Sequence, residues 1–191
     1  MQEFAVILIS TIFVNNIILV QCIGLGPFID SSNKMEAALG VAGLTSFVLM
    51  LSTIASFMID NWLLIPLHIE YLKTVFFIFI ILVIVQLVNM YIEKNKPLLH
   101  RSVGNFLPLI STNSAVIGVV IRANSGDYNF IEVTLYSLGA SIGFALILIS
   151  FSAMREKITA ADVPQPFKGT SIFLITAGLT SLAFMGFIGI V

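Results

Sequence analysis

The stretch that decides the fold is Val75–Val85, which reads VFFIFIILVIV. It lies in a longer apolar segment, Tyr71–Tyr91, whose only charged residue is Lys73. A helix of about 20 such residues crosses the ~30 Å hydrocarbon core of a bilayer. The rest of the chain is similar, because 58% of its 191 residues are hydrophobic and 10% are charged, against ~25% charged in a typical soluble domain. The composition predicts a polytopic membrane protein.

Five other segments have the length and composition of this one. Backbone groups in lipid must pair within their own segment, so each segment is expected to be a helix. The fold predicted is an all-α integral membrane protein with six transmembrane helices in a single domain, residues 1–191. Met1-Gln2-Glu3 lacks the basic start of a cleavable signal, so the first segment is expected to be retained. The predicted spans are Phe4–Leu25, Met35–Ile59, Tyr71–Tyr91, Val103–Ile121, Phe130–Met154 and Thr170–Val191.

The Lys and Arg residues of the loops predict the orientation. Seven of them follow spans one, three and five, and two follow spans two and four. Positive loops stay in the cytoplasm, so both termini are predicted to lie outside the cytoplasmic (inner) membrane. The seven are Lys34, Lys94, Lys96, Arg101, Arg155, Lys157 and Lys168, and the two are Lys73 and Arg122.

The chain also shows a weak internal repeat. Asn16 lies 20 residues before Glu36, and Asn113 lies 19 residues before Glu132. Each Asn falls within an apolar span, and each Glu opens the next span. Because three spans per half is an odd number, the halves near 1–95 and 96–191 would have opposite orientations, as in an inverted repeat. Chance pairing of Asn and Glu is the alternative.

The first span of each half contains the features of a broken helix. Gly24-Leu25-Gly26-Pro27 ends span one, and Pro108 lies in span four; Gly and Pro mark places where a membrane helix can break. Breaks at matching positions of two halves are a sequence pointer to a midplane functional site. The alternative is that each amide only joins neighbouring helices. The residues predicted to line an ion or electron path are Asn15, Asn16, Asn113 and Ser114.

Two other pairs are expected to serve packing. Gln86 and Asn89 are three residues apart, share a helix face and are predicted to face the protein interior. Gly139 and Gly143 form a G-x-x-x-G spacing that permits close approach of another helix. The sequence leaves open whether that helix belongs to this chain or to a partner.

Several classes of function are not supported by the sequence. It contains no Walker A, G-x-G-x-x-G, C-x-x-C or H-E-x-x-H motif. The net charge of −1 offers no electrostatic attraction for nucleic acid. The single cysteine, Cys22, excludes an internal disulfide. No predicted span has an acid or base near its centre, which argues against proton or sodium pumping by this chain alone.

Four stretches resemble a known family of membrane subunits. They are FVNNIILVQCIGLGPFI at 13–29, FLPLISTNSAVIGV at 106–119, ADVPQPFKG at 161–169 and ITAGLTSLAFMGF at 175–187. They are similar to the A subunits of the Rnf complex and to their homologues in the sodium-pumping NADH:quinone oxidoreductase. The resemblance implies a translocase complex that couples electron transfer between ferredoxin and NAD to sodium or proton transport, with this chain active only as one of its components.

The resemblance also implies partners and a cofactor. The partners would be subunits B, C, D, E and G, above all the E subunit, which has a similar fold and the opposite orientation. In the family this pair holds a [2Fe-2S] cluster between its broken helices, with two cysteines from each protein. Here those positions are Gly26 and Ser114. Cys22 lies four residues before Gly26 and is the one thiol that this chain could offer as a metal ligand, the alternative being a buried, inert thiol.

Three explanations of the missing cysteines stay open. The cluster is absent and electrons take another route, or other ligands hold it, or this chain keeps the scaffold while ion coupling occurs elsewhere. Two rival functions are a stand-alone secondary transporter, which inverted repeats and broken helices also fit, and a purely structural subunit of such a complex.

Overall fold

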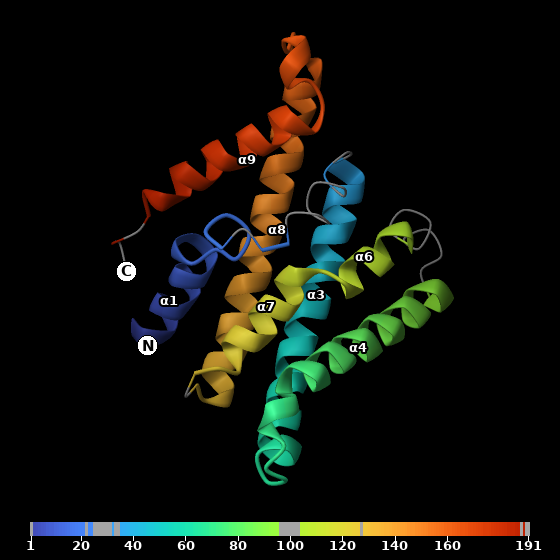
Figure 1. Cartoon of the computed structure of the whole chain (residues 1–191), viewed down its shortest axis with the longest axis vertical. Coiled ribbons are helices and arrows are strands. Elements are labelled where there is room, and N and C mark those ends of the chain that lie inside the picture. The colour runs from blue at the N-terminus through green and yellow to red at the C-terminus, as the bar shows by residue number, and fades with distance from the viewer. Residues whose placement is uncertain are drawn as a thin grey trace.

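The structure is a computed structural model that describes residues 2–21, 23–24, 32, 35–95, 104–126, 128–187 and 189. Within these ranges the chain is all-helical, with no strand (Figure 1). Short π or 3-10 segments, labelled η, extend or precede several α-helices. The elements are α1 (Gln2–Ile9), η1 (Ser10–Val14), α3 (Met35–Ile59), η2 (Asp60–Leu64), η3 (Glu70–Leu72), α4 (Lys73–Asn95), η4 (Gly104–Phe106), α6 (Leu107–Ser111), α7 (Ser114–Ala123), α8 (Phe130–Ala160), η5 (Gln165–Phe167) and α9 (Thr170–Met185).

Three described helical segments are long and apolar enough to cross a bilayer: Met35–Leu64, Glu70–Asn95 and Phe130–Ala160. The other three predicted spans correspond to shorter apolar helices, at Phe4–Val14, Leu107–Ala123 and Thr170–Met185. The all-helical, apolar character predicted from composition is therefore confirmed, and the count of six spans stays a prediction. The predicted end of the first span, Leu25, lies outside the described residues; among those described, regular helix stops at Val14 and turns follow it.

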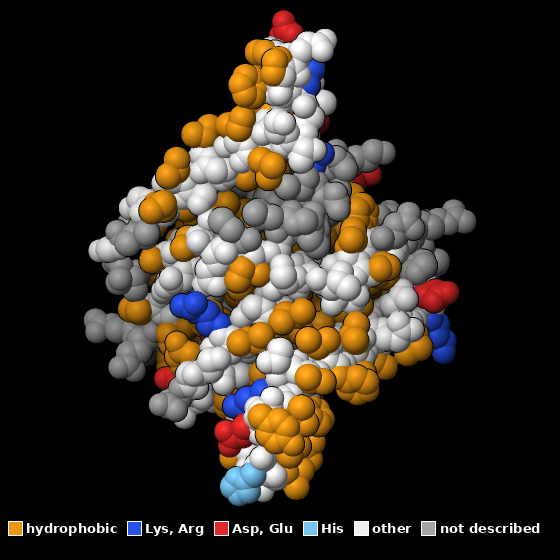
Figure 2. All heavy atoms as spheres, in the orientation of Figure 1, with side chains coloured by type: hydrophobic (Ala, Val, Ile, Leu, Met, Phe, Trp, Pro, Cys, Tyr) orange, Lys and Arg blue, Asp and Glu red, His pale blue; other side chains and the backbone are white. Residues whose placement is uncertain are grey.

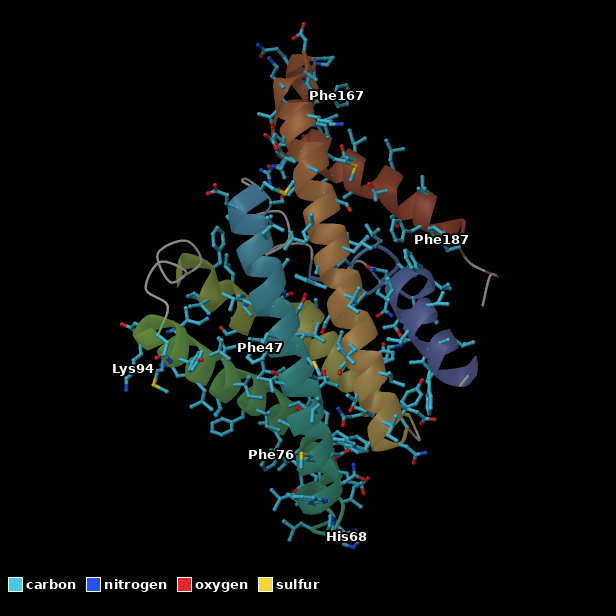
Figure 3. The ribbon with its side chains drawn as sticks, turned by 180° about the vertical axis from the view of Figure 1, so that it is seen from behind. Phe47, His68, Phe76, Lys94, Phe167 and Phe187 are labelled. Atoms are coloured by element: carbon cyan, nitrogen blue, oxygen red, sulfur yellow. The ribbon has the colours of Figure 1, made fainter. Side chains whose placement is uncertain are left out.

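The centre of the molecule is the pair α3 and α8, which run side by side with α4 flanking one side and α1 the other (Figures 1 and 3). Small side chains allow this pair to approach closely, as membrane helices commonly do. The hydroxyl of Ser46 donates to the carbonyl oxygen of Ser141 (2.9 Å), and the hydroxyl of Ser141 lies 3.1 Å from the carbonyl oxygen of Ser46. The Ser141 hydroxyl has a single proton and lies closer to the carbonyl oxygen of Ser137 in its own helix (2.7 Å), so the hydrogen bond donated by Ser46 is the one that ties α3 to α8.

The Gly139–Gly143 spacing packs against the first helix of the same chain. A Cβ on Gly139 would lie 3.0 Å from Cβ of Thr11, and a Cβ on Gly143 would lie 3.3 Å from Cα of Ile12. The two glycines therefore let the backbone of η1 lie directly on α8. The structure thus places this helix contact within the chain, which the sequence left open.

The outer surface is apolar. Large hydrophobic side chains are exposed along α4 and α9, including Phe79, Leu179 and Leu182, and hydrophobic atoms cover much of the visible face in Figure 2. α9 diverges from the end of α8 and runs back toward η1, where Phe13 stacks on Phe184 at 6.4 Å between ring centroids (Figure 1). Exposed apolar helices with hydroxyls and amides buried between them suit a lipid solvent.

Candidate functional site

The first helix is interrupted at Asn15 and Asn16. The amide nitrogen of Asn15 donates to the carbonyl oxygen of Ser10 (2.7 Å) and ends the π turn. The side chain of Asn16 then serves both sides of the break. Its Nδ2 donates to the carbonyl oxygen of Ile12 (2.9 Å), and its Oδ1 accepts from the backbone N–H groups of Ile18 (3.1 Å) and Leu19 (3.3 Å). Asn16 is 1% exposed, so it replaces backbone partners that water cannot supply.

The second interruption separates α6 from α7. Pro108 lies at the start of α6, and its carbonyl oxygen accepts from the hydroxyls of Ser111 (2.7 Å) and Thr112 (3.1 Å). Asn113 is the N-cap of α7, and its Oδ1 accepts from the N–H of Ala115 (3.0 Å). An Asn cap satisfies a backbone donor that a new helix would otherwise leave unpaired. Both breaks are therefore stabilised by a buried Asn side chain.

The turns that follow the first break meet the second break in space. The backbone N–H of Gly24, 90 residues before Ser114, donates to the Ser114 hydroxyl at 2.9 Å. Gly24 has a φ of +87°, which an L side chain rarely adopts. A Cβ at Gly24 would lie 2.7 Å from Cβ of Ala115 and 2.9 Å from Oδ1 of Asn113. Glycine is thus required at this point both for its backbone angle and for the close approach of the two breaks.

The four predicted site residues differ in exposure and surroundings. Asn113 and Ser114 lie together at the meeting of the breaks, where Asn113 is buried and Ser114 is exposed. Asn16 is buried against Gly143 of α8. Asn15 is exposed and donates from Nδ2 to the Ser10 hydroxyl at 3.0 Å. Nδ2 of Asn113 is buried and has no hydrogen-bond partner among the described residues, so this site has a spare donor.

The donors described here do not fit an iron–sulfur cluster. Such clusters are held mainly by Cys thiolates, whereas Ser114 presents a hydroxyl that already accepts the Gly24 N–H. Cys22 and Gly26 lie outside the described residues. In the described part of the chain no group of three or more His, Cys, Asp or Glu side chains is placed to hold a metal.

Asp60 is the polar residue that the sequence analysis missed. The predicted second span ended at Ile59, but the helix continues through η2 and leaves Asp60 only 4% exposed. Oδ2 of Asp60 pairs with Nζ of Lys73 at 2.7 Å. The predicted spans have no acid near their centres, yet the chain does bury an acid at the end of one of them. The apolar residues Trp62-Leu63-Leu64 after Asp60 are the part of the sequence that could have indicated a helix continuing past Ile59.

The predicted interior pair of the third span is only partly buried. Gln86 is exposed and Asn89 is half-buried, so the prediction that both face the interior is wrong for Gln86. Both line a cavity of about 310 Å³ between α4 and α6, together with Pro108 and Ser111. Oδ1 of Asn89 is buried without a hydrogen-bond partner among the described residues. A polar hollow thus lies beside the second helix break.

Comparison with known proteins places this architecture in a family. The family model described as Rnf-Nqr subunit, membrane protein, matches residues 4–191. The chain is 54% identical to a protein of Hahella chejuensis, 53% to one of Aliivibrio salmonicida and 52% to one of Pseudoalteromonas atlantica, each over 100% of this chain and 99% of the relative. Each of these relatives is named as the A subunit of an ion-translocating oxidoreductase complex. The family model and the full-length similarity together show that this chain belongs to the Rnf-Nqr family of membrane subunits.

Proposed function

We propose that this chain is the A-type membrane component of an Rnf-type complex, which couples electron transfer between ferredoxin and NAD to ion translocation. The names of the full-length relatives support the complex. The contact between the two helix breaks, from Gly24 to Ser114, is the observation that carries a role in transport, because midplane breaks at matching positions build the sites of many membrane transporters. The chain works only with partners, namely subunits B, C, D, E and G.

We infer further that six spans form two inverted repeats, near 1–95 and 96–191. The contact between Ser46 and Ser141 supports this arrangement, because each hydroxyl lies within hydrogen-bond distance of the other residue's carbonyl oxygen, as in elements related by a two-fold axis. A buried Asn at each break supports it as well. Both termini would lie outside the inner membrane, as the loop charges predict.

The four polar residues at the breaks would have two different roles, one structural and one in the ion or electron path. Asn16 and Asn113 pair the interrupted backbone and keep each break open. Asn15 and Ser114 are exposed and would present polar groups to the ion or electron path. The E subunit, of similar fold and opposite orientation, would cover this face. Because the donors here do not fit a cluster, Ser114 has no part in iron ligation.

The test uses the assembled complex in membrane vesicles. Ser114→Ala removes the acceptor of the Gly24 N–H, and Asn113→Leu removes the cap of α7. Both variants are expected to lower ion uptake together with electron transfer, while Thr134→Ala, which loses a hydroxyl bonded within its own helix, leaves both unchanged. If Ser114→Ala and Asn113→Leu left both activities at the wild-type level, the breaks would have no part in the mechanism.

A copurification experiment separates the complex from a stand-alone transporter. The tagged chain is expected to bring down five companion proteins. A homodimer that transports ions without those companions would contradict the proposal and favour a secondary transporter.

A further inference from the structure

A polar cavity lies at the end of α3 and α4, away from the helix breaks. Its volume is about 300 Å³. The end of the molecule concerned carries His68 at its tip (Figure 3). Acidic, basic and amide side chains gather here in a protein that has few of them. The lining comes from the α3–η2 junction, the start of α4 and the segment after α7, with Asp60, Lys73, Asn124, Ser125 and Tyr128 among its members.

The carboxylate of Asp60 is only half paired. Oδ2 lies 2.7 Å from Nζ of Lys73, whereas Oδ1 is buried and has no hydrogen-bond partner among the described residues. A buried carboxylate oxygen without a donor is costly, because it has lost its water and gained nothing in return. The Lys73 side chain is 31% exposed, so its ammonium can exchange between Asp60 and water.

Asn124, which lines the same cavity, carries a second unpaired oxygen. Its Nδ2 donates to the carbonyl oxygen of Val120 at 2.7 Å, which fixes the orientation of the amide. Its Oδ1 is buried without a partner among the described residues. Asn124 is 9% exposed and Asp60 is 4% exposed. Two residues from segments far apart in sequence therefore line one cavity, and each carries a buried acceptor oxygen with no hydrogen-bond partner among the described residues.

The chemistry of this pair selects a hard monovalent cation. Carboxylate and amide oxygens are ligands for hard ions, and soft metals prefer thiolate or imidazole. A divalent ion would call for more negative charge, but Asp60 is the only carboxylate among the described residues that line the cavity, and Lys73 already neutralises it. The single negative charge of Asp60 is balanced by the Lys73 ammonium. A monovalent cation could replace that ammonium without changing the net charge of the site.

We propose that Asp60 Oδ1 and Asn124 Oδ1 bind a sodium ion, and that the Lys73 ammonium competes with it for the carboxylate. With the orientation proposed above, this cavity lies at the outer end of the membrane domain, where an exported cation would leave. That place in transport rests on the proposed function. The binding of sodium to this site does not, and it is measured without electron transfer.

The test is equilibrium binding of ²²Na⁺ to the full chain in lipid nanodiscs at alkaline pH. Wild-type protein is expected to show saturable binding. Asp60→Asn removes the charge and Asn124→Leu removes the amide oxygen, and each is expected to weaken binding about tenfold or more. Lys73→Gln removes the competitor, so it is expected to tighten binding by about tenfold. The control Glu70→Gln loses an exposed carboxylate near the cavity and leaves binding unchanged.

The opposite signs for Asp60 and Lys73 distinguish an ion site from a structural ion pair. A structural pair alone would give no saturable sodium binding, and breaking it from either side would only lower stability. Absence of binding to wild-type chain, weaker binding by Lys73→Gln, or equal losses in Asp60→Asn and Glu70→Gln would each overturn the proposal. Circular dichroism checks folding, and if Asp60→Asn does not fold, Lys73→Gln and Asn124→Leu decide the outcome. Failure here would leave the copurification test of the complex untouched.

Discussion

Replacing Gly24 by alanine tests whether the two helix breaks are held in direct contact. Gly24 has a φ of +87°, and the left-handed region costs an L residue about 1–2 kcal/mol. The new Cβ would also lie 2.7 Å from Cβ of Ala115 and 2.9 Å from Oδ1 of Asn113. Forcing such atoms apart in a packed interior costs about 1–3 kcal/mol. We therefore expect Gly24→Ala to lower the free energy of unfolding by about 2–5 kcal/mol.

A matched control separates the two contributions. Gly169 has a φ of +85°, and a Cβ built on it meets nothing within 4 Å. Gly169→Ala should therefore show a backbone cost alone, about 1–3 kcal/mol, because its ψ of −137° also belongs to a region that L residues rarely adopt. The assay is unfolding of each full-length variant in mixed detergent micelles with increasing SDS, followed by circular dichroism. Equal losses in the two variants would refute the close approach of the breaks at Gly24.

Three further predictions concern the helix contacts and the missing thiolate. In the same assay Gly143→Ala should lower the free energy of unfolding by about 1–3 kcal/mol, because its Cβ would lie 2.9 Å from Nδ2 of Asn16. The control Gly178→Ala has open space around the new Cβ and should be neutral or stabilising. Similar losses in both variants would contradict the close packing at Gly143. A double-mutant cycle of Ser46→Ala and Ser141→Ala should give a coupling of about 0.6 kcal/mol, and a coupling of zero would mean that the Ser46–Ser141 contact does not stabilise the helix pair. EPR spectroscopy of the reduced complex should show no two-iron signal from the membrane pair, and such a signal would contradict the assignment of this site.

The long helices were predictable because their signal is local. Met35–Ile59 is both a predicted span and the observed extent of α3, and Phe130 begins both the fifth predicted span and α8. Apolar composition over some 20 residues decides solvent preference, and backbone pairing in an apolar solvent then imposes a helix. The end of α8 was placed too early, at Met154 in place of Ala160, because the charged turn after Arg155 continues the helix beyond the apolar segment.

The second break was predicted at the right place, the first was predicted too late along the chain, and the hydrogen bonds at both were not predicted. Pro108 and the amide of Asn113 predicted where regular helix stops in span four. In span one the break was predicted at Gly24–Pro27, whereas regular helix stops at Val14. The hydrogen bonds show that Asn16 and Asn113 pair the backbone at these stops. Whether an amide side chain serves its own helix or a ligand depends on which backbone groups lack partners at that place, and spacing alone does not give this.

The burial of Asp60 could not be predicted from the residues next to it in the sequence. Residue by residue it looked like the first polar position of a loop after Ile59. Its burial arises because η2 continues the helix and α4 returns beside it, bringing Lys73 within 2.7 Å. Asn124 lines the same cavity only because α7 packs on α3 and α4. Neither neighbour could be inferred from distance along the chain.

The sequence by itself determined that this protein resides in a membrane, where its long helices lie, where the second of its two helix breaks lies and to which family it belongs. These properties follow from composition, from Pro and Gly chemistry and from similarity, all of which are read along the chain. The tertiary structure alone decided that Gly24 and Ser114 are in contact, that Gly139 and Gly143 seat the first helix on α8, and that a half-paired carboxylate and an amide with an unpaired oxygen line one cavity. Burial and pairing are properties of packed neighbours, so they exist only once helices distant in sequence are brought together.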